Sequence, residues 1–161
     1  MRWYFLIVLL AAIACTPSKR EADTTSTVAA INDLPTLPIT LTDSTRLNVR
    51  ELPGNTILIL YLSDCDHCQR EAESIKEKIK AFKSYTIYFI SHEPADVQLK
   101  FAEKYGLTSE PNVKFARTTF SMIVSNFGAI ATPSVYIYSS EKRLVKQFNG
   151  ETNIEEIIKF L

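Results

Sequence analysis

Glycine and net charge are both scarce in this chain of 161 residues. It has four glycines, and its 18 lysines and arginines are balanced by 18 aspartates and glutamates. Phosphate-binding loops depend on closely spaced glycines, and nucleic acids are bound through clusters of basic residues. The sequence has neither a glycine-rich loop nor a basic stripe with interleaved aromatic residues. We therefore expect neither a nucleotide nor a nucleic acid as a partner.

Cysteine is equally scarce, and its three positions differ in context. Cys15 follows an apolar segment near the N-terminus, whereas Cys65 and Cys68 form one close pair. A single pair cannot provide the network of disulfides that stabilises small exported domains. We therefore expect the pair to serve chemistry rather than stability.

The N-terminal apolar segment is too short to stay in a membrane as a helix. Twelve uncharged residues, 3–14, follow Arg2, whereas a transmembrane helix takes about 20 residues. This length is typical of the apolar region of a secretory signal. The small residues before Cys15 resemble the lipobox of bacterial lipoproteins, which implies cleavage before Cys15 and lipid on its sulfur. The alternative is an ordinary secretory signal that leaves Cys15 as a free thiol, and either reading predicts export.

The composition changes twice along the chain. Residues 1–14 are interpreted as a lipoprotein signal peptide. Residues 15–36 are interpreted as a flexible tether, because 16–32 are rich in Thr, Ser, Ala and charge and lack periodicity. Residues 37–161 are expected to form one domain.

That domain has the pattern of an α/β fold. Continuous runs of β-branched and other apolar residues at 56–62 and 86–91 are typical of strands buried on both faces of a parallel sheet. Each is followed by apolar residues spaced three and four apart, which indicates a helix; the first such helix is expected to extend to Phe82. Strand, helix, strand, helix predicts parallel βαβ crossovers.

Further elements are expected around this centre. An N-terminal hairpin is predicted across the polar turn 42–46, and a short strand at 113–115 precedes a helix that carries Phe120 to Phe127. A second hairpin, 134–138 with 144–148, and a last helix end the chain. The fold class is thus a central mixed sheet flanked by helices.

The paired cysteines lie where the first buried strand gives way to a helix. A disulfide-exchange catalyst needs one thiolate that attacks and a second thiol that resolves the mixed disulfide. Backbone N–H groups and the helix dipole stabilise a thiolate at a helix start, so Cys65 is the expected nucleophile and Cys68 the resolving thiol. A protonated His67 would favour the reduced form, whereas Asp64 and Asp66 would oppose it. The direction of electron flow therefore stays open.

The sequence Cys65-Asp66-His67-Cys68 after a hydrophobic strand, together with Thr132-Pro133 before another strand, resembles the thioredoxin superfamily over residues 37–161. The similarity is to its extracytoplasmic TlpA-like and cytochrome c maturation branch. It implies a thioredoxin-like fold with a βα insertion before a cis Thr132–Pro133 bond that faces the cysteines. Thr132 would then offer main-chain groups to the substrate, and Pro133 would shield the thiols. The alternative is an ordinary trans proline that opens a strand.

Glu71 lies three residues after Cys68 and matches the CxxCxxE pattern of the cytochrome-maturation branch. The resemblance implies that Glu71 handles the proton of Cys68; the alternative is a solvated residue near the helix start. Two positions depart from the superfamily. Asp64 replaces an aromatic residue, and Ile59 stands where thioredoxin has an acid.

The function that follows is a membrane-anchored thiol–disulfide oxidoreductase of the cell envelope. Its partners would be envelope protein thiols and disulfides and a membrane redox donor or acceptor. It would need no metal and no cofactor beyond its Cys65–Cys68 disulfide. It would be anchored to the cell membrane or outer membrane, facing the periplasm if the source is Gram-negative.

The sequence leaves three alternatives open. One is a thioredoxin-fold binding module without turnover, because fold alone does not establish function. Another is a metal carrier that adds His67 or His92 to the cysteines, although structural zinc sites take four ligands. The third is a peroxidase of the peroxiredoxin type, which would need Thr or Ser where this chain has Leu62.

Overall fold

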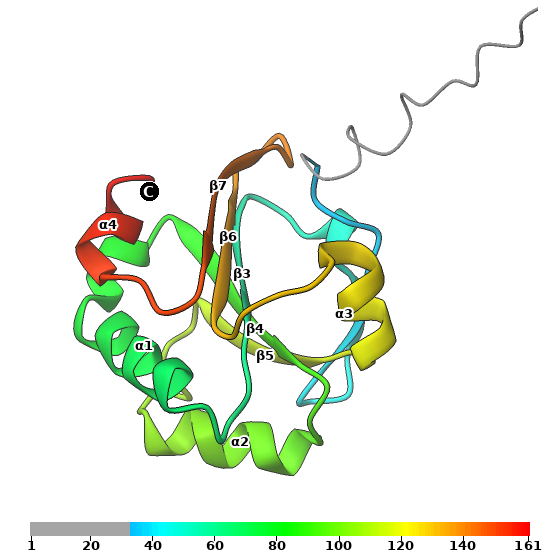
Figure 1. The fold of residues 1–161 in the computed structure, drawn as a ribbon, viewed down its shortest axis with the longest axis horizontal. Helices are drawn as coiled ribbons and strands as arrows, with labels where there is room; N and C mark the ends of the chain where they lie inside the picture. The colour runs from blue at the N-terminus through cyan, green and yellow to red at the C-terminus, as the bar shows by residue number, and fades with distance from the viewer. Residues whose placement is uncertain (1–32) are drawn as a thin grey trace, which may run out of the picture.

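The computed structural model of the chain describes residues 33–161 (Figure 1). The predicted signal peptide, Cys15 and residues 15–32 of the predicted tether lie outside the described residues. Within 33–161, none of the helices combines the length and the apolarity that crossing a bilayer requires.

One seven-stranded mixed sheet forms the centre, in the order β2-β1-β5-β4-β3-β6-β7. The three inner strands β3, β4 and β5 are parallel, and every other neighbouring pair is antiparallel. The predicted crossovers are therefore confirmed, as are both hairpins. The strands are β1 (Pro38–Leu41), β2 (Arg46–Asn48), β3 (Asn55–Leu60), β4 (Tyr85–Ser91), β5 (Val113–Arg117), β6 (Ser134–Tyr138) and β7 (Leu144–Asn149).

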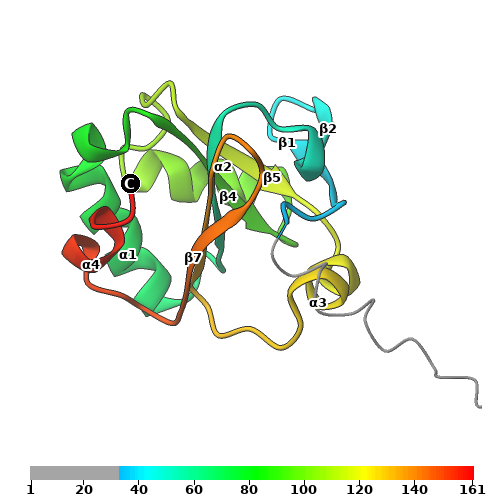
Figure 2. The same ribbon diagram turned by 90° about the horizontal axis from the view of Figure 1, so that it is seen from above.

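Four α-helices cover the two faces of this sheet unequally (Figures 1 and 2). Helices α1, α2 and α4 contribute apolar residues to one core cluster, and α3 contributes to the cluster on the other face together with the N-terminal hairpin. The helices are α1 (Asp66–Glu77), α2 (Ala95–Lys104), α3 (Phe120–Phe127) and α4 (Ile154–Ile158), with 3-10 turns at Val49–Glu51 and Ile79–Phe82.

Strand β3 is buried on both faces, as its continuous apolar sequence predicts. Ile57 and Ile59 belong to the cluster under α1 and α2, whereas Leu58 and Leu60 belong to the opposite cluster. This alternation follows from the two-residue period of a strand. Because apolar atoms cover β3 on both sides, the segment that follows it starts from a fixed position.

The predicted helix through Phe82 is shorter than expected. Helix α1 ends at Glu77, and Ile79–Phe82 forms a 3-10 turn instead. Apolar residues three apart meet on one face of a 3-10 helix as well as of an α-helix, so the sequence pattern does not separate the two. The end of α2 matches its prediction, because Gly106 follows with a φ of +64°.

The packed domain begins earlier than the predicted boundary at residue 37. Leu34 is 1% exposed, and its N–H donates to Lys142 O at 2.9 Å. Asp33 bridges to Arg143 beside the second hairpin. The last residues assigned to the tether, 33–36, are therefore part of the domain. A single leucine in a polar stretch gives no periodic signal, which is why the sequence places the boundary too late.

Replacing Leu34 tests this boundary. We expect Leu34→Ala to lower the free energy of unfolding by about 2–5 kcal/mol, because it removes a fully buried side chain. The matched control is Leu99→Ala, whose side chain is 39% exposed and should change stability by less than about 1 kcal/mol. Urea unfolding of both variants measures the difference. If Leu34→Ala lowers the free energy of unfolding as little as the control does, the packed domain starts after Leu34.

Candidate functional site

Cys65 caps the N-terminus of helix α1. It has extended backbone angles, φ −84° and ψ 112°, and the N–H of Cys68 donates to its Sγ at 3.3 Å. The segment from β3 turns into the helix through a hydrogen bond from Cys65 N–H to Leu62 O at 3.3 Å. A capping side chain satisfies one of the free N–H groups of the first turn. When that side chain is a thiolate, the same groups stabilise its charge.

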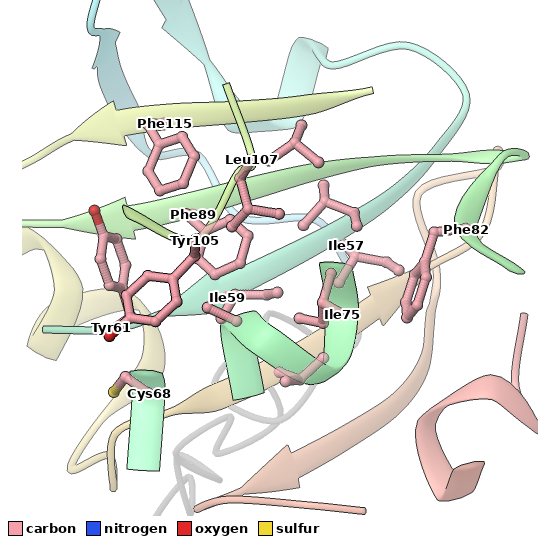
Figure 3. Packing of buried hydrophobic residues seen from close by; sticks show 14 of the residues in the cluster. Ile57, Ile59, Tyr61, Cys68, Ile75, Phe82, Phe89, Tyr105, Leu107 and Phe115 are labelled. Atoms are coloured by element: carbon pink, nitrogen blue, oxygen red, sulfur yellow. The ribbon is translucent and has the colours of Figure 1, made fainter. Parts of the chain in front are cut away.

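Cys68 lies one turn deeper than Cys65. It is 2% exposed and belongs to the core cluster drawn in Figure 3, at one end beside Tyr61. Burial raises the pKa of Cys68, and the hydrogen bond and charge of Cys65 add to this rise. Cys65 is only half-buried. The two thiols therefore differ in the way that an attacking and a resolving thiol should.

Tyr61 is a neighbour of Cys68 that the sequence did not single out. Its hydroxyl is buried without a hydrogen-bond partner among residues 33–161. Burial raises the pKa of Tyr61, and the charges of Glu93 and Cys68 contribute. The hydroxyl therefore stays protonated and lies within electrostatic range of the buried thiol.

The turn at Thr132 faces Cys65. Cys65 Sγ lies 3.5 Å from Thr132 O and 3.8 Å from Thr132 Oγ1. The Thr132–Pro133 peptide bond is cis, the isomer that the resemblance implies, and Pro133 is buried. These residues meet because β6 pairs with β3, with Ser134 opposite Leu60. The structure thus brings Cys65 and Thr132 into contact across 67 positions of sequence.

The carboxylate of Glu93 binds the segment that leads into Cys65. The N–H and the hydroxyl of Ser63 donate to the two oxygens of Glu93 at 2.9 and 2.6 Å, and the Ser91 hydroxyl donates to it at 3.1 Å. Sequence reasoning did not identify Glu93. The signal available was its place two residues after the end of β4, because the carboxyl ends of neighbouring parallel strands share one edge of a sheet.

Glu71 is buried rather than solvated. It is 2% exposed, its Oε2 accepts the N–H of Thr152 at 3.2 Å, and its Oε1 has no partner among the described residues. Burial raises the pKa of Glu71 to about 7, and the charge of Glu151 adds to the rise. The alternative of a solvated helix residue is therefore wrong. The spacing of three residues places Glu71 and Cys68 on one face of α1.

Glu151 is a further residue that the sequence analysis missed. Arg70 donates to both of its oxygens, at 2.8 and 2.7 Å, and His67 Nδ1 lies 2.5 Å from Oε2. These bonds, first that of Arg70 and then that of His67, lower the pKa of Glu151 to about 2. The pKa of Arg70 is raised first by its bond to Glu151, with smaller contributions from Asp66 and Cys65. Arg70 is therefore a cation within electrostatic range of Cys65.

Of the three predicted tuning residues, His67 is oriented differently from the expectation. The imidazole of His67 is turned toward Glu151 and also meets Arg70 Nη2 at 2.7 Å. Asp64 and Asp66 are both exposed on the segment around Cys65. The charge environment of Cys65 thus includes Arg70, which is itself paired with Glu151, and its balance is not set by His67 and the two aspartates alone.

One short loop after β7 connects the separate parts of the site. Gly150 N–H donates to Pro133 O at 2.8 Å, Glu151 binds Arg70, and Thr152 N–H binds Glu71. Three consecutive residues therefore contact the cis-proline turn, the surface of α1 and its buried acid.

A metal site is not assembled in the described part of the chain. Within residues 33–161, no three or more His, Cys, Asp or Glu side chains gather in a way that could hold a metal ion. His92 instead packs edge-on against Phe120, with ring centroids 5.8 Å apart.

Comparison with known proteins identifies a matching family and solved structures with a similar fold. The AhpC/TSA family matches residues 32–147. No curated protein sequence matches the chain. Among solved structures, a secreted disulfide oxidoreductase of Mycobacterium tuberculosis homologous to E. coli DsbE is 15% identical, with a TM-score of 0.66 over 82% of this chain and 96% of that one.

Two other solved structures are similar to the same extent. A putative protein disulfide isomerase from Bacteroides thetaiotaomicron has 20% identity and a TM-score of 0.65, over 80% of this chain and 84% of that one. A peroxiredoxin-like protein from Aquifex aeolicus has 15% identity and a TM-score of 0.66, over 80% and 82%. These likenesses confirm the predicted thioredoxin-like fold.

The raised pKa of Glu71 predicts a pH dependence of stability. Well below pH 4.5 its carboxyl is protonated in both states, whereas between pH 4.5 and about 7 the folded state holds the proton that the unfolded state has lost. Stability should therefore fall as pH rises from 4.5 through about 7, by on the order of 3 kcal/mol. Glu71→Gln should lack this component of the decline. Chemical unfolding between about pH 4 and pH 8 measures it.

The exposed Glu73, on the same helix, provides the control. Glu73→Gln should retain the wild-type decline. Identical pH profiles for wild type and Glu71→Gln would contradict the assignment of a raised pKa.

Removing the carboxylate of Glu151 should change the reduction potential of the cysteine pair. Glu151→Gln leaves Arg70 uncompensated near Cys65, which favours the thiolate of the reduced form. We expect the potential to rise by roughly 10–30 mV in equilibrium with glutathione. Glu155→Gln, which removes an exposed carboxylate paired with Lys78, is the control and should leave the potential unchanged. A fall in potential in Glu151→Gln would refute this electrostatic account.

Proposed function

The chain belongs to the AhpC/TSA family, and we propose that it is a thiol–disulfide oxidoreductase that exchanges disulfides with exported proteins. The observation that carries the proposal is the position of Cys65. Its sulfur accepts a helix N–H at 3.3 Å and lies 3.5 Å from Thr132 O. The same sulfur thus lies at the start of a helix, whose N–H groups would stabilise a thiolate, and beside the Thr132–Pro133 turn, which we expect to meet an incoming peptide.

The exchange takes two steps. The Cys65 thiolate attacks one sulfur of a substrate disulfide, forms a mixed disulfide with it, and releases the other substrate sulfur as a thiolate. Cys68, once deprotonated, attacks the sulfur of Cys65 and releases the remaining substrate thiolate. Two electrons pass from the cysteine pair to the substrate, and the pair ends as a Cys65–Cys68 disulfide. The same steps in reverse oxidise a substrate dithiol.

Glu71 supplies the base that the second step needs. Burial raises the pKa of Cys68, so the resolving thiol does not ionise readily by itself. A carboxyl whose pKa is about 7 exchanges its proton readily near neutral pH. Its buried Oε1 has no hydrogen-bond partner among residues 33–161, and the three-residue spacing puts Glu71 on the same face of α1 as Cys68, which supports a role in accepting the proton of Cys68.

The peroxidase alternative has less support. A peroxiredoxin-like fold neighbour is known, but Leu62 stands three residues before Cys65 and has no hydroxyl to bind a peroxide. Disulfide exchange is better supported, because Thr132 already contacts the sulfur of Cys65.

The proposed place of action is the cell envelope. The apolar segment 3–14 before Cys15 supports export with a lipid anchor on that cysteine. The partners are then envelope proteins with accessible cysteines, and a membrane dithiol or disulfide that restores the pair after each turnover.

Trapping tests the proposal directly. Cys68→Ser should attack substrates but fail to resolve, so we expect it to accumulate mixed disulfides through Cys65 on at least ten times as much protein as the wild type. Non-reducing gels and mass spectrometry of envelope fractions detect and identify them.

The controls are Cys65→Ser and the double variant, neither of which should trap a partner. Wild type should also reduce a small disulfide such as hydroxyethyl disulfide. A protein that neither reduces this compound nor forms mixed disulfides would be a binding module instead of a catalyst.

A further inference from the structure

A pocket of about 600 Å³ lies between the N-terminal hairpin, the end of β5 and the starts of helices α2 and α3. This volume is within the range of small-molecule binding sites. Neither Cys65 nor Thr132 belongs to its lining. The pocket is therefore a separate feature from the sulfur site.

Two arginines and a threonine form a row across three neighbouring strands at this pocket. Strands β2, β1 and β5 lie side by side (Figure 2), and Thr40 of β1 is paired with Arg46 of β2 on one side and with Arg117 of β5 on the other. Residues directly opposite each other in antiparallel strands have their side chains on the same face, with Cβ atoms about 5 Å apart. Both arginine side chains and the Thr40 hydroxyl therefore share one face, and all three residues line the pocket.

The positive charge of this row is not neutralised by the residues between 33 and 161. None of the ion pairs formed there includes Arg46 or Arg117, and no acidic residue lines the pocket. The Nε–H of Arg117 donates to His92 O at 3.2 Å, which orients the guanidinium and leaves its two terminal nitrogens for another partner. Guanidinium groups bind phosphate oxygens through paired N–H donors. The row thus has the chemistry of an anion site.

The pocket also has an apolar part. Ile39 is 2% exposed, and Leu47 and Met122 are half-buried and pack against the core cluster below α3. All three side chains line the pocket. A bare ion would bind the arginines without covering this surface, whereas a ligand with an apolar group would remove it from water.

We propose that this pocket binds a small phosphate monoester with an apolar stem. Its phosphate contacts Arg46, Arg117 and the Thr40 hydroxyl, and its stem packs against Ile39 and Leu47. A phosphate monoester carries close to two negative charges at neutral pH, which matches two arginines better than the single charge of a carboxylate does. This inference is independent of the proposed disulfide exchange.

Three probes test the ligand class by isothermal titration calorimetry on the full-length protein. They are hexyl phosphate, inorganic phosphate, which lacks the stem, and hexanoate, which has a similar stem but only one charge. We expect hexyl phosphate to bind at least about tenfold more tightly than inorganic phosphate, because the stem buries apolar surface. It should exceed hexanoate by a similar factor, because charge-assisted hydrogen bonds to the second arginine are lost.

Two variants assign the binding to the arginine row. Arg46→Gln and Arg117→Gln each remove one exposed cation and should each weaken the binding of hexyl phosphate at least about tenfold. The matched control is Lys114→Gln, which removes an exposed cation from β5 outside the pocket lining and should bind hexyl phosphate as the wild type does. Because Arg46 forms no ion pair within 33–161, its replacement tests the site even if Arg117→Gln disturbs the segment at His92.

Each contrary result overturns the proposal. Wild type that does not bind hexyl phosphate would show that the pocket is not a phosphate site. Equal affinities for hexyl and inorganic phosphate, or for hexyl phosphate and hexanoate, would show that the ligand class is wrong. Unchanged binding in both arginine variants, or an equal loss in Lys114→Gln, would show that the phosphate binds elsewhere or through net charge alone.

Discussion

A sulfur atom occupies the capping position of helix α1, and the rest of the site depends on that contact. The N–H of Cys68 points at Cys65 Sγ, 3.3 Å away, where other helices place an oxygen. The same turn that leaves Cys65 half-buried places Cys68 in the core, where burial raises its pKa. Capping at the helix start and burial in the core thus give two chemically identical side chains unequal surroundings, which is the property that disulfide exchange requires.

The sheet explains how distant residues reach that sulfur. Strands β3 and β4 run parallel, so Cys65 and Glu93 leave them at the same edge. Strand β6 is antiparallel to β3 and begins at that edge with the Thr132–Pro133 turn, and β7 ends there opposite it, with Asn149 paired to Ser134. The loop that binds Glu71 and Arg70 therefore emerges beside the cysteines.

Local patterns in the sequence predict most of this fold and the pair Cys65 and Cys68, because buried strands, helix faces and the cysteine spacing are all short-range signals. They do not predict Glu93 or Glu151, because Ser63, which binds Glu93, and His67, which binds Glu151, lie 30 and 84 positions away and the neighbourhoods of both acids look like ordinary polar surface. The burial of Glu71 and Leu34 depends on loops that close over them from elsewhere in the chain. The orientation of His67 toward Glu151 likewise follows from tertiary packing, so its charge could not be assigned to Cys65 from spacing alone.

The relative reactivity of the two thiols is the most direct measure of the central claim. Brief treatment of the reduced protein with iodoacetamide near neutral pH, followed by peptide mass spectrometry, gives a separate alkylation rate for each cysteine. The capping contact and the burial of Cys68 predict that Cys65 reacts at least about a hundredfold faster. Equal rates, or a faster Cys68, would contradict the assignment of Cys65 as the nucleophile.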